Sequence, residues 1–456
     1  MLVVTLPRSA MKHPTAFARK AKRAGADILE IRGDLTPRVR QFASPLPILL
    51  ALRGASEELI RTLRPKYLDL ELGEKVEKTP VRIKSIRSYH DYRRTPSLRE
   101  LRVIVGKLRQ ERPWMIKIAT VVRTYEDLRT LETLRVRLER ARVRAVVLGM
   151  GEKAHLIRAL SPLHSPLTYA YLDGSAPSAP GQLSLSFTRS EKHLRSPRIF
   201  GILGGSQVTQ SLSPAIHRAL FQRAHVDALY ARFPTENLSD AWTNLGALGV
   251  RGFSVTAPFK RAILRYAKRV DPLAKKLRSA NTMMRTKQGQ WMAFNTDVHG
   301  FGCGYPFLKS CTRVAILGAG GVVPAVIEAL SRICPSAEVT VYARNVRKAT
   351  KVLTKGTEVR LLSELRRRPA DAIICAIPKD IRVALPPAKK GMQAIDLRYG
   401  GETKFLSSAK RAGYRTHDGL SMLLHQALAQ FQLFTGRRVR SDAALRIKRI
   451  LRHQIT

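Results

Sequence analysis

Two residues in the first half of the 456-residue chain are of types that perform covalent and proton-transfer chemistry. Lys117 lies inside the apolar segment 114–119. A cation is costly there, so this lysine must pair with an anion, have a lowered pKa, or form an imine. A lowered pKa is what an amine nucleophile needs to form a Schiff base. His90, in the Ser-Tyr-His-Asp-Tyr segment 88–92, is the nearby group that titrates close to neutral pH.

The second half carries a glycine-rich turn of the kind that binds a dinucleotide. The turn Gly-Ala-Gly-Gly at 318–321 follows an apolar segment and precedes a helical pattern. Glycines let the backbone approach a pyrophosphate, and a helix N-terminus presents amides to it. The next apolar segment ends at Arg344, which suits the 2′-phosphate of NADP, where an acidic residue would bind the ribose of NAD. The alternative is that Arg344 is one more surface arginine.

Short apolar segments position the first pair of residues. They alternate with helical patterns over the first 175 residues or so, as strands of a parallel sheet buried on both faces do. Eight such segments predict a (β/α)8 barrel, whose chemistry usually lies at the strands' carboxyl ends. The length is short for that fold, so some helices must be trimmed or missing. The predicted strands are 2–6, 28–31, 48–52, 67–72, 81–86, 114–119, 145–148 and 167–171.

The composition of the linking segments divides the chain. A Pro-, Ser- and Gly-rich stretch at 173–181 and a polar segment at 188–197 place a domain boundary near 190–197. Beyond it, strand and helical patterns alternate, which predicts a doubly wound α/β arrangement. The predicted strands there are 198–203, 313–317, 338–342, 372–376 and 393–397.

Motifs of the second half occur in a fixed order. They are Ser-Leu-Ser-Pro at 211–214, Gly-Phe-Ser-Val-Thr-Ala-Pro-Phe-Lys at 252–260, Asn-Thr at 281–282, Asn-Thr-Asp at 295–297, the glycine turn, and Gly-Leu-Ser-Met-Leu-Leu-His-Gln at 419–426. Each fragment alone could be a turn or a helix cap. The ordered set resembles the shikimate dehydrogenase family over nearly all of 198–440.

This resemblance implies a two-domain fold with a Rossmann domain that binds NADP, and reduction of 3-dehydroshikimate to shikimate by NADPH. Lys260 and Asp297 would be the acid/base pair. The substrate-binding residues would be Ser211, Ser213, Thr256, Asn281, Tyr399 and Gln426, and the cofactor-binding residues Gly318, Ala319, Gly320, Gly321, Arg344 and Gly419.

Three positions depart from the family's pattern. Ser254 stands where the family usually has Asn, close to the substrate. The Asn-Arg-Thr phosphate clamp is replaced by Ala-Arg-Asn at 343–345, and the Asn-Ala-Thr-Pro turn near the nicotinamide by Cys-Ala-Ile-Pro at 375–378. The departures bear on cofactor geometry and rate more than on the class of reaction.

Three segments of the first half, with a Ser-Ala-Pro-Gly-Gln motif at 178–182, resemble type I 3-dehydroquinate dehydratase over about 1–185. The segments are Glu-Ile-Arg at 30–32, Ser-Tyr-His-Asp at 88–91 and Lys-Ile-Ala at 117–119. The resemblance implies that Lys117 forms an imine with the substrate ketone and that His90 shuttles the proton, with no metal. The residues that would bind the carboxylate and hydroxyls are Glu30, Arg32, Arg53, Arg158, Ser178 and Gln182. A short loop at 148–151 departs from the family's pattern.

The two resemblances explain one another, because the product of the dehydratase is the substrate of the dehydrogenase. We therefore expect a bifunctional enzyme of the shikimate pathway. Its expected domains are a barrel at 1–190, a substrate-binding domain at 198–300, a Rossmann domain at 301–430, and a C-terminal helix within 431–456 that returns to the substrate domain.

The net charge of +47 first suggests a nucleic-acid partner. However, residues 1–200 hold 39 basic and 19 acidic residues and residues 201–456 hold 42 and 15, threaded between apolar positions rather than gathered in a polar arm. We expect small-molecule carboxylates as partners rather than nucleic acid or a membrane, and a homo-oligomer is left open.

The four cysteines lack the spacing of a zinc site, and no signal or membrane segment is evident, so a cytoplasmic location is expected.

Two other functions are compatible with parts of this sequence. One is a quinate/shikimate dehydrogenase that uses NAD, against which the paired serines and Arg344 speak. The other is a catalytically silent regulator that senses metabolites with this fold and binds nucleic acid. The intact pairs Lys117/His90 and Lys260/Asp297 argue against it.

Overall fold

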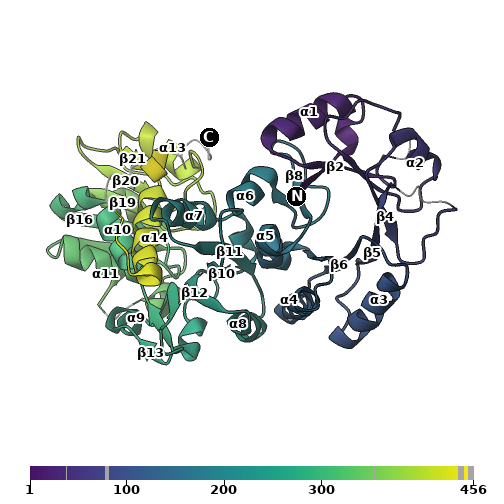
Figure 1. Ribbon diagram of the computed structural model, residues 1–456. Helices are drawn as coiled ribbons and strands as arrows, with labels where there is room; N and C mark the ends of the chain where they lie inside the picture. Colours follow the sequence, from purple (N-terminus) through teal and green to yellow (C-terminus); the bar gives the residue numbers. More distant parts are fainter. Residues whose placement is uncertain (37–38, 78–81, 354–355, 440–445, 450–456) are drawn as a thin grey trace. The chain divides into compact units, whose positions relative to one another are not determined.

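The computed structural model describes residues 1–36, 39–77, 82–353, 356–439 and 446–449 (Figure 1). By internal contacts it divides into two compact units. The first comprises residues 1–201, 206–209 and 227–250, and the second comprises 202–205, 210–226 and 251–456. Each proposed reaction has its side chains within one unit.

The first unit contains a nine-stranded sheet whose order is β7-β6-β5-β4-β3-β2-β1-β8-β9. Its paired strands are parallel. Among the described residues the ladder ends at β7 and β9, so the strands follow the order of a barrel whose seam lies between β7 and β8. The strands are β1 (Leu2–Thr5), β2 (Ile28–Arg32), β3 (Ile48–Ala51), β4 (Tyr67–Glu71), β5 (Lys84–Asp91), β6 (Met115–Val121), β7 (Ala145–Met150), β8 (Thr168–Tyr171) and β9 (Leu183–Ser184).

The eight predicted strands are all present, because continuous apolar segments mark strands buried on both faces. The predicted bounds of the fifth strand were wrong, and the difference changes the position of His90. Strand β5 was predicted at 81–86 but runs from Lys84 to Asp91, and residue 81 lies outside the described residues. Its parallel pairing with β6 continues through His90 opposite Ala119, so His90 lies on the strand instead of after it.

Helices cover the barrel incompletely, as the short length predicts. No helix follows β2 or β4 in the part of the chain that the structure describes. The helices present are α1 (Pro14–Ala24), α2 (Glu58–Leu63), α3 (Leu98–Gln110), α4 (Tyr125–Arg140), α5 (His155–His164) and α6 (Leu185–Ser190). Capping boxes at Ser97 and Thr124 fix the starts of α3 and α4.

Strand β11 (Ala228–Pro234) and helix α8 (Leu238–Ala247) group with the barrel, although they follow the boundary expected near 190–197. The carboxylate of Asp240 accepts hydrogen bonds from the backbone amides of Tyr125 and Glu126 at the start of α4. The Tyr125 hydroxyl donates to the carbonyl of Pro234 at 2.9 Å. These contacts, of which the tyrosine hydrogen bond is buried, attach α4 to the segment 227–250.

Two six-stranded sheets follow the barrel, in the orders β11-β10-β12-β14-β15-β13 and β18-β17-β16-β19-β20-β21. The first adds β10 (Arg198–Gly204), β12 (Val250–Val255), β13 (Arg269–Val270), β14 (Thr282–Arg285) and β15 (Trp291–Phe294). The second, fully parallel, comprises β16 (Arg313–Leu317), β17 (Glu338–Ala343), β18 (Glu358–Leu361), β19 (Ala372–Cys375), β20 (Gln393–Asp396) and β21 (Arg415–His417). Their helices include α7 (Ser213–Arg223) and α9 (Pro272–Leu277).

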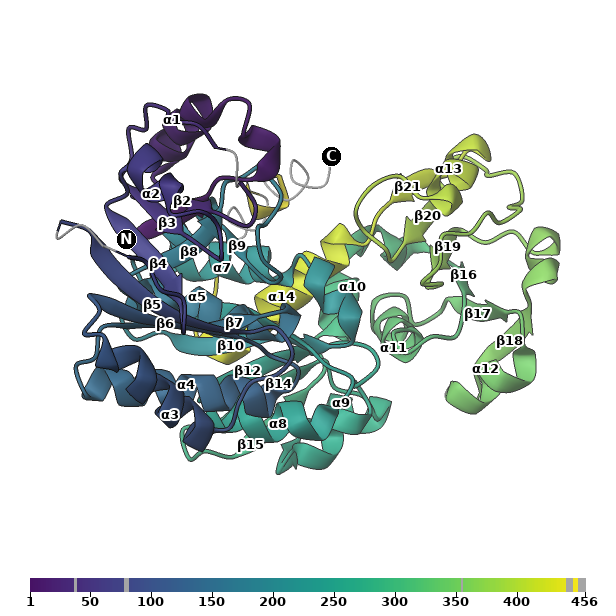
Figure 2. The same ribbon diagram turned by 90° about the vertical axis from the view of Figure 1, so that its right-hand side faces the viewer.

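The parallel sheet of the second unit has helices on both faces. Helices α11 (Val323–Ile333) and α12 (Val346–Val352) lie on one side and α13 (Lys404–Arg411) on the other (Figure 2). Alternate residues of β16 serve the two faces: Ile316 is buried in the core beneath α11, and Leu317 in the core beneath α13. This is the doubly wound arrangement that the sequence predicts.

Helix α14 (Leu420–Thr435) returns from this sheet and packs against α10 (Asp297–Gly304) and α7. We expected the returning helix within 431–456, which was wrong at its start. The buried stripe from Leu420 to Phe434 belongs to one helix, which Gly436 ends in a left-handed conformation. Residues 440–445 and 450–456 of the expected segment lie outside the described residues.

Candidate active sites

The first site is a cavity of about 240 Å³ among the barrel strands. It gathers all eight residues predicted for this half: Glu30, Arg32, Arg53, His90, Lys117, Arg158, Ser178 and Gln182. The pairing register of the strands explains why some of these side chains lie together. Glu71 pairs with Ser88, and Ser88 with Lys117, so the three form one row across β4, β5 and β6. His90, two residues beyond Ser88, faces the same side.

Lys117 is a buried, paired ammonium. Its Nζ lies 2.9 Å from Oδ2 of Asp69 and 3.8 Å from Oε1 of Glu30, and all three side chains are almost wholly inaccessible. Burial alone would lower the pKa of this lysine, but Asp69, with smaller contributions from Tyr169 and Glu30, outweighs it and holds the pKa above its usual value. The sequence left three states open for Lys117: pairing with an anion, a lowered pKa, or an imine. In the free protein, the lysine is paired with an anion. The nucleophilic amine requires loss of a proton.

His90 is held by a carboxylate that sequence reasoning missed. Its Nδ1 lies 2.9 Å from Oε2 of Glu71, and its backbone amide donates to Oε1 of the same residue at 2.7 Å. Arg53, which also pairs with Glu71, places its guanidinium about the imidazole, with nitrogens 2.9 and 3.0 Å apart. Burial, with the nearby Lys117 and Arg53 cations, lowers the pKa of His90 against the opposing effect of Glu71. A neutral imidazole can accept a proton.

Arg158 supplies a cation without an acidic partner. It lies in α5, is 5% exposed, and donates from Nε to the carbonyl of Gly149 at 2.7 Å. Among the described residues no carboxylate lies within ion-pair distance of its guanidinium. Burial lowers the pKa of Arg158 to about 10, so it remains charged at neutral pH. Gln182 accepts from the amide and hydroxyl of Ser178 at 2.8 and 2.9 Å beside it. This part of the cavity suits a carboxylate.

The second site is built on a lysine–carboxylate pair in the second unit. Lys260 Nζ lies 2.7 Å from Oδ2 of Asp297, whose side chain is buried in the first turn of α10, where the helix dipole favours an anion. The Asn281 amide donates to Oδ1 of Asp297 at 2.8 Å and to Gln426 at 3.4 Å. The structure thus brings four of the predicted residues together. Thr256 directly follows β12, partly exposed.

A second group in this unit contains two hydroxyls and a phenol. The Ser213 amide donates to the hydroxyl of Ser211 at 3.2 Å, and both serines are buried at the start of α7. Burial raises the pKa of Tyr399, opposed by its hydrogen bond with Ser211. All three predicted residues are therefore adjacent.

Ser254, one of the unusual positions, donates to the side-chain oxygen of Gln430 at 2.6 Å. Gln430 in turn donates to the carbonyl of Asn281 at 3.1 Å and to the hydroxyl of Thr282 at 3.0 Å. Sequence reasoning missed Gln430, because its spacing from Gln426 is simply one turn of a helix. The serine therefore supports the backbone that carries Asn281.

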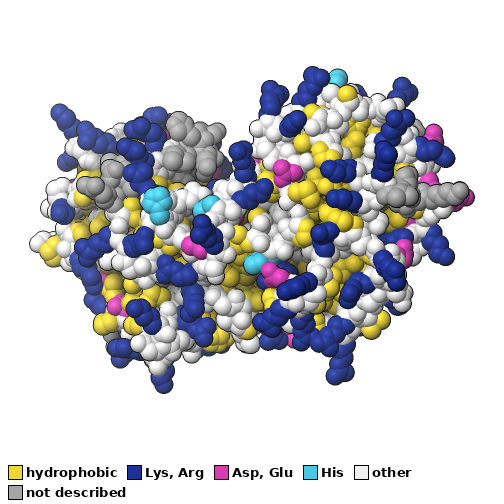
Figure 3. Space-filling model, in the orientation of Figure 1, with side chains coloured by type: hydrophobic (Ala, Val, Ile, Leu, Met, Phe, Trp, Pro, Cys, Tyr) yellow, Lys and Arg dark blue, Asp and Glu magenta, His cyan; other side chains and the backbone are white. Residues whose placement is uncertain are grey.

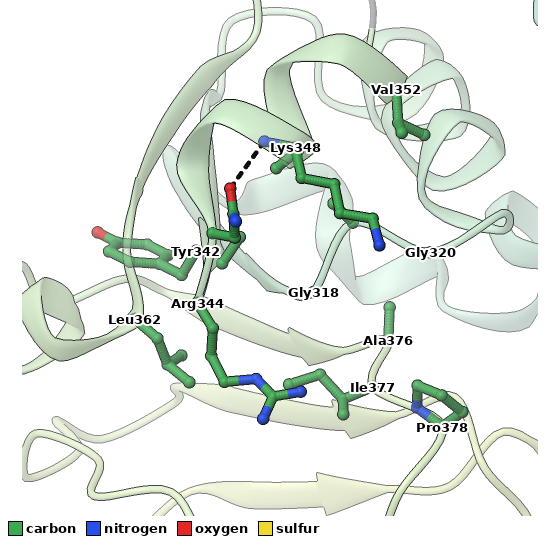
Figure 4. Close-up of a pocket in the computed structure, with 14 residues that line it drawn as sticks. Gly318, Gly320, Tyr342, Arg344, Lys348, Val352, Leu362, Ala376, Ile377 and Pro378 are labelled. Carbon is green, nitrogen blue, oxygen red and sulfur yellow. Dashed lines mark hydrogen bonds between the residues drawn. The ribbon is translucent and has the colours of Figure 1, made fainter.

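A second cavity, of about 540 Å³, lies beside the glycine turn (Figure 4). Gly318 has φ +98°, and a Cβ there would come within 2.9 Å of Ile377. Arg344 and Lys348 extend into the space beside the turn, and Asn345 accepts from the amide of Lys348 at 2.9 Å (Figure 4). The lining described has two cations and no carboxylate. The cavity therefore fits a dinucleotide with an additional phosphate.

Two predicted cofactor residues lie outside the described lining of this cavity, Gly321 and Gly419. A Cβ on Gly419 would come within 2.1 Å of the carbonyl oxygen of Leu397, so this glycine permits close packing of α14 against the end of β20. Sequence reasoning missed Lys348, although it lies four residues after Arg344, in the first turn of α12. In a chain with 81 lysines and arginines, that signal is weak.

Comparison with known proteins gives matches over both halves. A family profile described as type I 3-dehydroquinase matches residues 2–191. A profile of the shikimate dehydrogenase substrate binding domain matches residues 203–283, and one of the shikimate 5′-dehydrogenase C-terminal domain matches residues 419–445. The profiles follow one another in the order that the motifs predict.

Individual proteins show the same likeness. The bifunctional 3-dehydroquinate dehydratase/shikimate dehydrogenase of Arabidopsis thaliana, named as chloroplastic, is 28% identical over 91% of this chain and 79% of its own length. The shikimate dehydrogenase (NADP(+)) of Bacillus cereus strain AH187 is 33% identical over 53% of this chain and 93% of its own. The crystal structure of shikimate dehydrogenase from Aquifex aeolicus matches with a TM-score of 0.50 at 30% identity, over 56% of this chain and 98% of that one.

Proposed function

The chain belongs to the shikimate dehydrogenase family and carries a type I 3-dehydroquinase ahead of that module, and on this premise we propose how its two sites work. It has 3-dehydroquinate dehydratase and NADP-dependent shikimate dehydrogenase activity. The first reaction yields 3-dehydroshikimate, which the second reduces to shikimate.

In the dehydratase site, Lys117 Nζ attacks the ketone carbon of 3-dehydroquinate after losing its proton. The carbinolamine expels water and leaves a cationic imine, which acidifies the adjacent C–H. His90 removes that proton, and the hydroxyl on the neighbouring carbon leaves as water with a proton returned by the imidazolium. Hydrolysis of the conjugated imine frees the enone and the lysine. The buried Lys117 and the neutral His90 in one cavity carry this proposal.

Charge decides how the substrate lies in this site. Arg158, a buried cation with no acidic partner in the described part of the chain, takes the carboxylate, with Ser178 and Gln182 beside it. Glu30 and Arg32 on β2, with Arg53 just after β3, bind the ring hydroxyls. The carboxylate is thus held apart from Lys117, so that the ketone end of the ring faces the amine.

In the dehydrogenase site, Lys260 donates a proton to the ketone oxygen of 3-dehydroshikimate as the carbon is reduced. Asp297 orients the ammonium at 2.7 Å, and Asn281 holds the carboxylate from its other oxygen. Ser211, Ser213 and Tyr399 bind the substrate carboxylate, while Thr256 and Gln426 bind ring hydroxyls. NADPH, when bound, supplies the hydride.

The cofactor is held at the glycine turn 318–320, with Arg344 and Lys348 on the 2′-phosphate. An NAD-dependent quinate dehydrogenase is the rival, and rates with shikimate and quinate in the presence of NADP or NAD separate the two. A clear preference for quinate with NAD would overturn the proposal.

The four cysteines are free thiols, as in a reducing compartment, and on that ground we place the enzyme in the cytoplasm. Among the described residues, no helix has the length and apolarity needed to cross a membrane.

The imine is tested by trapping. We expect incubation with 3-dehydroquinate followed by borohydride to add the mass of the reduced adduct to the peptide that contains Lys117. Lys260→Ala is the matched control, because it removes a lysine from the other site and should leave the adduct intact. Absence of an adduct in the wild-type enzyme would refute the imine mechanism.

A further inference from the structure

One wall of the dehydratase cavity is formed by a tyrosine to which the imine mechanism assigns no role. Tyr169 lies on β8 and lines the cavity together with His90 and Lys117. Its side chain is largely buried, the residue being 8% exposed. The polar group next to the hydroxyl is the Lys117 ammonium, which can only donate, and among the described residues no acceptor takes the O–H in a hydrogen bond of normal geometry. A buried hydroxyl that donates to no acceptor destabilises the fold, so such a group in a cavity wall indicates an acceptor that arrives with a ligand.

Other buried tyrosines of this chain show that the hydroxyl is ordinarily satisfied. Tyr125 donates to the carbonyl of Pro234 at 2.9 Å, and Tyr305 donates to the carbonyl of Asp418 at 2.7 Å. Tyr414 is the other described tyrosine whose buried hydroxyl lacks a partner, and it lies in the core beneath α13. Tyr169 differs from Tyr414 in facing a cavity, and the cavity contains the reactive lysine.

The ring of Tyr169 also faces Lys117. Nζ of Lys117 lies 4.2 Å from the ring centroid, over its face, within the range in which an aromatic ring attracts a cation. A substrate joined to Nζ therefore brings its ring substituents next to this phenol. Burial raises the pKa of Tyr169, so the hydroxyl is protonated at neutral pH and available as a donor.

We propose that the Tyr169 hydroxyl donates a hydrogen bond to an oxygen substituent of the ring substrate held at Lys117, while the ring face stabilises the cationic imine. The inference rests on the proposed dehydratase function and deepens it. It assigns the site a substrate that is oxygenated beside the imine carbon. It also accounts for a buried O–H group that finds no acceptor among the described residues of the free protein.

The test removes the hydroxyl alone, in Tyr169→Phe, and uses Tyr414→Phe as the matched control. We expect kcat/KM for 3-dehydroquinate to fall by roughly ten- to a hundredfold in Tyr169→Phe, because a substrate oxygen then lacks its donor. The Tm should not fall, since no partner in the free protein is lost. Tyr414→Phe should leave kcat/KM unchanged. Borohydride should still label Lys117 in both variants, because the amine and the aromatic ring remain.

Any other outcome refutes either the role of Tyr169 or the proposed dehydratase function. If the wild-type enzyme turns over 3-dehydroquinate and Tyr169→Phe has the same kcat/KM, the inference is wrong and the proposed function stands. If the loss of activity comes with a fall in Tm that Tyr414→Phe does not show, Tyr169 has a structural role and the inference is again wrong. If the wild-type enzyme has no dehydratase turnover, the proposed function fails and the inference fails with it.

Discussion

Asp69 controls the charge of the catalytic lysine, and Asp69→Asn should expose that control. The attraction between Lys117 and Asp69 across 2.9 Å is roughly 6 kcal/mol at an effective dielectric constant of about 20. One pKa unit corresponds to about 1.4 kcal/mol, so losing even half of this attraction should lower the pKa of Lys117 by about two units. Burial then dominates, and the amine becomes neutral at a lower pH.

The assay is the pH dependence of borohydride trapping with 3-dehydroquinate, quantified on the Lys117 peptide. In the wild-type enzyme the rate should rise toward alkaline pH, because the pKa of Lys117 is raised. In Asp69→Asn the same rise should occur at lower pH. A midpoint that stays in place or moves to higher pH would refute the assignment of Asp69 as the group that holds the proton on Lys117.

The same variant should destabilise the fold. Removing one member of a buried pair costs about 3–5 kcal/mol in the free energy of unfolding. Lys117→Met alone leaves Asp69 buried without its cation, and the double variant removes both charges. Asp69→Asn should therefore cost much less in the Lys117→Met background than in the wild type. Equal costs in the two backgrounds would contradict the pairing.

Three further predictions follow from the other contacts. Lys260→Ala should lower kcat for reduction of 3-dehydroshikimate by about 10²- to 10⁴-fold, with the dehydratase rate unchanged; an equal loss of both activities would contradict separate sites. The double variant Arg344→Ala/Lys348→Ala should raise KM for NADPH by roughly ten- to a hundredfold and leave KM for NADH nearly unchanged; equal effects on both cofactors would contradict a phosphate contact. Glu71→Gln should lower the pKa of His90 further, because the carboxylate raises it, so the acidic fall of dehydratase kcat/KM should move to lower pH; a shift to higher pH would contradict the assigned contact.

The strands and the motif residues could be predicted because their signals are local. Apolar segments marked the barrel strands, and Lys117 stood out because a cation interrupts one of them. Asp69 and Glu71 could not be predicted to act, since they alternate with apolar residues along β4 and the side chains they contact lie on other strands. Their role appears only when β4 pairs with β5 and β5 with β6, which places them beside Lys117 and His90.

Long-range packing accounts for the other differences. Strand β11 and helix α8 group with the barrel because Asp240 caps a helix more than a hundred residues away in sequence, and such a contact leaves no local pattern. Gly419 was assigned to the cofactor from its motif, whereas its close approach to Leu397 is visible only in three dimensions.

The net charge of +47 remains largely unexplained by the chemistry. Lysines and arginines are scattered over the face drawn in Figure 3 rather than gathered in one patch. The residues to which the two sites give a role are a small part of the 81 basic residues. A general positive field helps to attract carboxylate substrates and a phosphorylated cofactor, but it does not identify a further partner.

The central claim is that one chain performs both reactions in succession, and a single measurement tests it most directly. Wild-type enzyme is given 3-dehydroquinate and NADPH, and oxidation of NADPH is followed. The account predicts steady oxidation in the wild type, none in Lys117→Ala, and oxidation restored in that variant when 3-dehydroshikimate replaces 3-dehydroquinate. Undiminished oxidation by Lys117→Ala with 3-dehydroquinate, or none by the wild type, would contradict it.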